Sequence, residues 1–131
     1  MKKKYLSKII ANDNEGLQMI SACCAGAEIK ISEIKYLQKN KVFLLSLRRN
    51  KIETENESNI VNSICKFEFV DSVKSKNINQ NEIDQKLELI TMDYLKNKNN
   101  YEISLIFTNN AYIALSSEII DVCLEDQEKI D

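Results

Sequence analysis

The sequence predicts an α+β fold in which one N-terminal helix packs on a mostly antiparallel meander sheet of about six to seven strands. Only one segment combines the apolar period of a helix with helix end signals, whereas most later segments alternate in the two-residue period of strands. The apolar strand faces exceed what one helix covers. We therefore expect a strongly curved sheet, either barrel-like or two-layered.

The 131 residues are expected to form a single domain, 1–131, because a chain of this length buries most of the surface that its unfolded form exposes. Its helix follows a strand at about 5–10. Asp13 is a suitable N-cap, and Gly26 supplies the left-handed residue that ends the helix. One helical face carries residues at i, i+3, i+4 and i+7: Leu17, Ile20, Ser21 and Cys24.

The remaining segments alternate as strands with polar turns between them. We expect a strand at 29–36 with a β-bulge at Ser32-Glu33, and a central strand at 42–47 that is covered on both sides. Further strands are expected at about 63–73, 85–95, 101–107 and 111–126, with a bend near 117–119. Asn109-Asn110 can take the positive φ values of a tight hairpin turn.

Composition excludes several chemistries. The chain has no histidine, no proline, no tryptophan and only two glycines. A catalytic triad with histidine, an imidazole-based zinc site and the glycine-rich phosphate loops are therefore ruled out. We expect no enzyme, cofactor or metal site. A remaining enzymatic alternative would use carboxylates such as Glu53 or Glu118.

The four cysteines favour packing over chemistry. Cys23 and Cys24 point about 100° apart on the helix, near its C-terminal end, where the dipole disfavours a thiolate. We expect Cys24 to face the sheet and Cys23 to be the thiol that an alkylating reagent reaches first. No segment is long enough for a membrane span or a signal-peptide core, which predicts a cytoplasmic protein with reduced thiols.

Charge differs between the two halves of the chain. Residues 1–51 carry eleven Lys/Arg and four Asp/Glu (+7), whereas residues 52–131 carry seven and sixteen (−9). This asymmetry favours binding of a protein partner or self-association as a homodimer, unless the charges interleave on one sheet. A basic patch of Arg48, Arg49, Lys74 and Lys76 would bind RNA or nucleotide phosphate if their strands are neighbours.

Four segments, between about Leu6 and Asp126, resemble an uncharacterised bacterial family, the domain of unknown function 2948. The segments are "DNEGLQMISA", "YLQKNKVFLLSLRRNKIE", "KFEFVDSVKSKNI" and "FTNNAYIALSSEIIDVCLED". The polar positions that match the family are Asp13, Ser21, Glu53, Glu118 and Asp126. The resemblance implies bacterial origin and a shared fold, without a reaction.

This chain departs from the family pattern at three places. The cysteine pair follows Ser21-Ala22, Asn50 and Ile52 replace aromatic residues, and Asn109-Asn110 replace glycines. The leading hypothesis is a non-enzymatic cytoplasmic module that binds a protein or itself, and the alternative is the basic patch.

Overall fold

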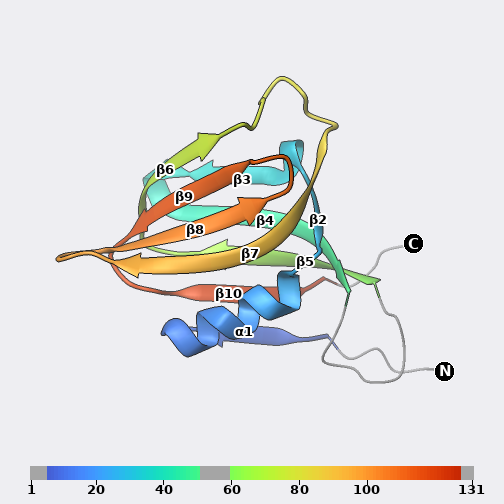
Figure 1. Cartoon of the computed structure of the whole chain (residues 1–131). Helices are drawn as coiled ribbons and strands as arrows, with labels where there is room; N and C mark the ends of the chain where they lie inside the picture. Colours follow the sequence, from blue (N-terminus) through green and yellow to red (C-terminus); the bar gives the residue numbers. More distant parts are fainter. Residues whose placement is uncertain (1–5, 51–59, 128–131) are drawn as a thin grey trace.

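The computed structural model describes residues 6–50 and 60–127, in which ten strands and one α-helix are found (Figure 1). The helix is α1 (Asn14–Cys24), and two short 3₁₀ helices, η1 (Ile31–Glu33) and η2 (Gln38–Asn40), flank β3. The strands are β1 (Lys8–Ala11), β2 (Glu28–Lys30), β3 (Ile34–Leu37), β4 (Val42–Asn50), β5 (Ile60–Phe67), β6 (Val70–Lys76), β7 (Lys86–Lys96), β8 (Tyr101–Phe107), β9 (Tyr112–Ser117) and β10 (Val122–Asp126).

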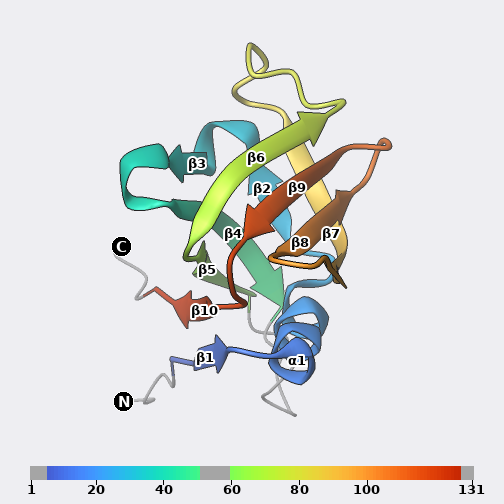
Figure 2. The same ribbon diagram turned by 90° about the vertical axis from the view of Figure 1, so that its left-hand side faces the viewer.

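All strand pairs are antiparallel, in the order β1-β10-β5-β4-β2-β7-β8-β9-β6, with β3 pairing β4 off this path. The α+β prediction with an antiparallel sheet is therefore confirmed. The predicted six to seven strands are wrong, because ten are present. The predicted strong curvature into a barrel is not found either: the sheet is open, and β1 and β6 are the two ends of its path. Consecutive strands pair as a meander in two places, β3-β4-β5 and β7-β8-β9, and the other neighbours in the sheet are not consecutive in the chain (Figure 2).

Strand β4 is central, as its apolar sequence predicts, because it pairs with β5 on one side and with β2 and β3 on the other. Alternate residues point into the core: Phe43, Leu45, Leu47 and Arg49. The opposite face is only half-buried at Val42, Leu44 and Ser46. The expectation that β4 is covered on both sides is therefore wrong, since nothing among the described residues covers its outer face completely.

Helix α1 has the predicted ends. Asp13 accepts a hydrogen bond from the Gly16 amide at 2.8 Å, and Gly26 has a φ of 83°. The Gly26 amide donates to the carbonyl of Leu89 in β7 at 2.7 Å, so the residue that ends the helix also attaches it to the sheet. The helix packs against β7, β1 and β4, and Leu17, Ile20 and Cys24 lie in the core.

Bulges and turns determine which residues of several strands face the core. The predicted bulge at Ser32-Glu33 is instead the 3₁₀ helix η1, which separates β2 from β3 while both stay beside β4. A register shift between Leu89 and Thr91 places Leu87, Leu89 and Met92 on the buried face and leaves Ile90 exposed. Strict alternation would place Met92 on the face opposite Leu87, and the bulge is the reason that both residues face the core.

The last two connections agree with the local sequence. Asn109 and Asn110 have φ values of 62° and 59°, as predicted for the hairpin between β8 and β9. The bend expected near 117–119 carries the chain from β9, beside β8, to β10, beside β5. Buried apolar residues from the helix and from both parts of the sheet form one core. No described helix is long and apolar enough to span a membrane.

Candidate functional site

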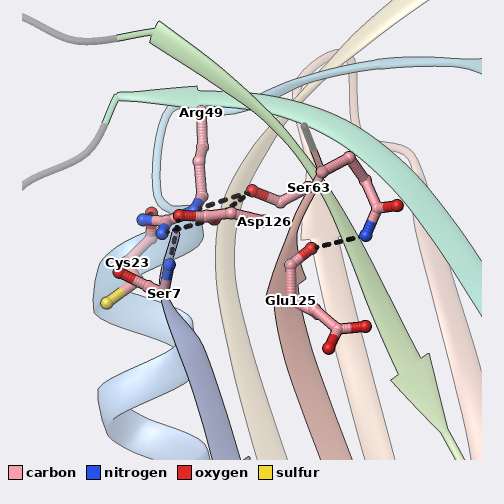
Figure 3. A network of polar contacts seen from close by, with 7 residues as sticks. Ser7, Cys23, Arg49, Ser63, Glu125 and Asp126 are labelled. Carbon is pink, nitrogen blue, oxygen red and sulfur yellow. Dashed lines mark hydrogen bonds and ion pairs between the residues drawn. The ribbon is translucent and has the colours of Figure 1, made fainter. Parts of the chain in front are cut away.

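Arg49 lies inside the protein in a network of polar contacts (Figure 3). Its Nη2 atom is 2.9 Å from Asp126 Oδ1, and both side chains are fully inaccessible to solvent. Arg49 Nε donates to Ser63 Oγ at 3.0 Å, and Ser63 Oγ donates to Asp126 Oδ1 at 2.7 Å. The two buried charges therefore neutralise each other and share one hydroxyl.

The same network reaches two further segments. Arg49 Nη1 points at the Cys23 carbonyl, 3.5 Å away at the C-terminal end of α1, and the Ser7 amide donates to Asp126 Oδ2 at 2.9 Å (Figure 3). No side-chain N or O atom buried among the described residues lacks a hydrogen-bond partner. Because the network is saturated and closed to solvent, we assign it a structural role that ties β4, β5, β10, α1 and the segment before β1 together.

The predicted basic patch does not form. Arg49 is buried on the inner face of β4, so its inclusion in a solvent-facing patch is wrong. Arg48 is exposed on the outer face, whereas Lys74 and Lys76 are exposed on β6. Strands β4 and β6 do not pair, and β2, β7, β8 and β9 lie between them along the sheet.

The polar positions that match the family have separate places. Asp13 caps α1, and Asp126 pairs with Arg49. Ser21 Oγ accepts a hydrogen bond from the Met92 amide at 2.9 Å, next to the bulge in β7. Glu118 is exposed. Glu53 lies outside the described residues.

The cysteines are free thiols. Cys24 and Cys65 are fully buried in the core, and Cys23 is 5% exposed. Cys123 is the most accessible of the four, so the expectation that Cys23 is reached first is wrong. A hydrogen bond with Cys24 and burial raise the pKa of Cys65 well above its usual value. No group of three or more described Cys, Asp or Glu side chains could hold a metal ion.

The outer face of β2, β3, β4 and β5 forms a shallow concave surface of about 620 Å³, here called the outer surface. Its cations are Lys30, Lys35, Arg48 and Lys86, and its anions are Glu28 and Glu33. Lys86 pairs with Glu28 at 3.3 Å. Lys30 lies directly opposite Lys86 on the neighbouring strand, which sets two like charges side by side.

A second cavity, of about 310 Å³, opens between β3 and β6, and we call it the edge cleft. Most of its lining residues have apolar or aromatic side chains, including Ile34, Tyr36, Phe43, Val73, Ile78 and Ile113, but polar atoms contribute at least as much of its exposed surface as apolar ones. Phe43 and Ile113 are buried, whereas Ile34, Tyr36 and Val73 are partly exposed and pack on the core. The cleft thus gives solvent access to one margin of the hydrophobic core.

Two unpaired strand edges border the edge cleft. Among the described residues β3 pairs only with β4, and β6 pairs only with β9. The far edge of each strand therefore carries backbone amide and carbonyl groups without a strand partner. Figure 2 shows β3 and β6 on neighbouring parts of the molecule. An extended segment between them could satisfy both edges at once.

Hydrogen bonds fix both ends of the edge cleft. At one end the Tyr36 hydroxyl donates to the Val70 carbonyl at 2.7 Å, and the Val70 amide donates to the Lys41 carbonyl at 2.8 Å. At the other end the Ser32 amide donates to the carbonyl of Ile83, in the loop that follows β6. The cleft is therefore preformed, with its length limited to the distance between these contacts.

Sequence reasoning missed the edge cleft, because it depends on which strands remain unpaired. The burial of Arg49 had a signal: alternation from Phe43 through Leu45 and Leu47 places Arg49 on the same face. A charged residue in phase with a core face requires a buried partner. Asp126 occupies the corresponding place on β10, two residues after the buried Leu124.

Comparison with known proteins places the chain in a family. Residues 7–130 match the family described as "Protein of unknown function (DUF2948)". Searches of curated proteins and of solved structures found no match. The matched range spans β1 to β10 and includes Arg49, Ser63 and Asp126. This protein therefore belongs to the DUF2948 family, as its resemblance in four segments indicated.

Proposed function

We propose that this protein is a non-enzymatic module that binds an extended segment of a partner protein in the edge cleft. The observation that carries the proposal is that two strand edges without a strand partner among the described residues meet at one cavity lined mostly by apolar residues. Addition of a strand to a sheet edge is a common mode of peptide recognition, in which main-chain hydrogen bonds give affinity and side-chain pockets give specificity.

The dimensions of the cleft suit a short segment. Strand β3 has four residues, so a segment of about four residues, roughly 13 Å when extended, would run along it. Its inward side chains would meet Ile34, Tyr36 and Val73, where partly exposed apolar surface would leave water. We further propose a cytoplasmic location, supported by four free cysteines, two of them fully buried. Bacterial origin remains a prediction.

A peptide titration tests this function. The probe is a fluorescent synthetic peptide whose five central residues alternate valine and threonine, and fluorescence anisotropy should show saturable binding to the full chain. Ser75 lines the cleft and is exposed, so Ser75→Trp should fill the cleft and abolish binding. Ser72 is exposed on the same strand without lining the cleft, so Ser72→Trp is the matched control and should bind normally.

Equal binding by the two tryptophan variants would contradict the edge cleft as the site. Light scattering of the wild type without peptide tests whether the chain forms a dimer, in which a second copy of the chain supplies the bound segment. A dimer that Ser75→Trp dissociates and Ser72→Trp preserves would replace the separate partner by self-association.

A second candidate function has its own observation. Like charges directly opposite on neighbouring strands destabilise a sheet, yet Lys30 faces Lys86 on the outer surface. A phosphate group bound there would neutralise this pair with help from Arg48 and Lys35, which makes RNA or a nucleotide the alternative ligand. Titration of the full chain at low salt with a labelled single-stranded RNA and with ATP tests whether the outer surface binds either ligand. Binding should weaken in Lys30→Ala and persist in Lys98→Ala, and an absence of binding to both ligands would exclude it.

A further inference from the structure

The geometry points to a partner segment that alternates apolar and acidic residues, the apolar ones directed into the edge cleft and the acidic ones facing Lys35, Lys74 and Lys76. This inference rests on the proposed function and names the chemistry of its ligand. It follows from the direction of alternate side chains on the two strands that border the cleft.

Strand β3 presents opposite chemistry on its two faces. Ile34 and Tyr36 line the cleft, so Lys35, between them, points to the outer face. Lys35 indeed lines the outer surface and is exposed. One border of the cleft therefore has apolar side chains inside and a cation outside.

Strand β6 repeats this arrangement on the other border. Val73 and Ser75 line the cleft, so the alternate residues Lys74 and Lys76 point outward, and both are exposed. Neither lysine has a carboxylate within ion-pair distance among the described residues. Asp71, the exposed carboxylate of β6, pairs with Lys41 at 3.0 Å, so the outward charges beside the cleft that have no ion pair among the described residues are lysines on both borders.

A strand inserted between β3 and β6 would have neighbours on both sides. Its inward side chains would contact the apolar residues of the lining, and an outward side chain opposite Lys35 would lie between this lysine and a lysine of β6. Opposite charges on neighbouring strands attract and like charges repel. Glutamate or aspartate at the outward positions satisfies both borders, whereas lysine or arginine there is repelled from both.

Three peptides of equal length test the inference. Their five central residues alternate valine with glutamate, with lysine or with threonine, and each is titrated against the full chain by anisotropy at low ionic strength. We expect the glutamate peptide to bind roughly tenfold more tightly than the threonine peptide and the lysine peptide to bind most weakly. Added salt should reduce these differences, because the lysines are exposed to solvent.

Charge reversal locates the effect. The double variant Lys74→Glu, Lys76→Glu should favour the lysine peptide over the glutamate peptide. The control Lys96→Glu, Lys98→Glu changes the net charge equally at the turn between β7 and β8, and it should leave the order of affinities unchanged. A reversed order in the control variant would overturn the assignment to β6.

The outcomes separate the two proposals. If all three peptides bind with equal affinity, the edge cleft accepts a strand without charge preference, and this inference alone fails. If none of them binds, the proposed function fails with it. If the glutamate peptide binds best and Ser75→Trp abolishes its binding, both hold.

Discussion

The Arg49–Asp126 pair is the residue-scale feature on which the packing of distant segments depends. Both charges lie in an environment without solvent, where each needs the other. Ser63 Oγ, between them, accepts from Arg49 Nε and donates to Asp126 Oδ1. The arginine is thus enclosed within the protein, where an external phosphate does not reach it.

We expect Asp126→Ala to lower the free energy of unfolding by about 3–5 kcal/mol, because it removes the buried carboxylate that pairs with the Arg49 guanidinium. Glu125 is exposed on the same strand, so Glu125→Ala should change stability by less than about 0.5 kcal/mol. Urea denaturation measures both. The double variant Arg49→Met, Asp126→Leu should recover most of the loss, and a loss as large as in Asp126→Ala would contradict the account.

The thiols give a second prediction at this scale. Native labelling with iodoacetamide, read by mass spectrometry of peptides, should modify Cys123 first and leave Cys24 and Cys65 unmodified until the chain unfolds. Because the pKa of Cys65 is raised in the folded state, its contribution to stability is complete below the ordinary thiol pKa of roughly 8.5 and is lost as pH rises above it. Between pH 7.5 and 9.5, stability should therefore fall more steeply in the wild type than in Cys65→Ala.

At the scale of elements, helix α1 and strand β7 meet at the bulge between Leu89 and Thr91. A bulge leaves a backbone group without its ladder partner. Ser21 Oγ accepts the Met92 amide there, and the Leu89 amide and carbonyl pair with Ala27 and Gly26. The helix and the residues that end it therefore complete the hydrogen bonding of an irregular strand.

Ser21→Ala should lower the free energy of unfolding by about 1–3 kcal/mol, since the buried Met92 amide loses its acceptor. Gln18 lies on the exposed face of the same helix, so Gln18→Ala controls for helix propensity and should be close to neutral. Thermal or urea unfolding provides the comparison. Hydrogen exchange at Met92 should accelerate in Ser21→Ala, and unchanged exchange would show that the serine is not its acceptor in solution.

At the scale of the whole molecule, most contacts join segments far apart in the chain. Strand β10 pairs with β1 and β5, and β2 lies between β4 and β7. This topology also mixes the two oppositely charged halves, because β4, from the basic half, pairs with β5, from the acidic half. The charge asymmetry of the sequence is thus spread over one sheet and does not form two opposed poles.

Such a topology predicts slow folding, on the order of milliseconds to seconds, since non-local strand pairs must close long loops first. The chain has no proline, so its unfolded state has no slow prolyl isomers. In stopped-flow experiments, refolding should therefore lack a slow phase that a prolyl isomerase accelerates. This should hold for any length of time that the chain spends unfolded before refolding begins. A phase that grows with this time would contradict the prediction.

The features predicted correctly from the sequence are those that neighbouring residues determine. Asp13 and Gly26 specify the ends of α1, and Asn109-Asn110 specify a hairpin, because each acts on its own backbone. The burial of Arg49 depends on Asp126, 77 residues away. The edge cleft depends on the absence of a second partner for β3 and β6, which no local pattern encodes. The predicted number of strands was wrong because three segments that the sequence shows as continuous are divided, by η1, by the turn after β5 and by the bend after β9.

The position of Asp126 has a consequence for synthesis of the protein on the ribosome. Strand β10 must leave the exit tunnel before β1 has its strand partner, before β5 has its second one and before Arg49 can pair with Asp126. Until then, the nascent chain has an arginine on the core-facing side of β4, and the edges of β1 and β5 that pair with β10 are open. The final fold is therefore reached only after residue 126 has emerged.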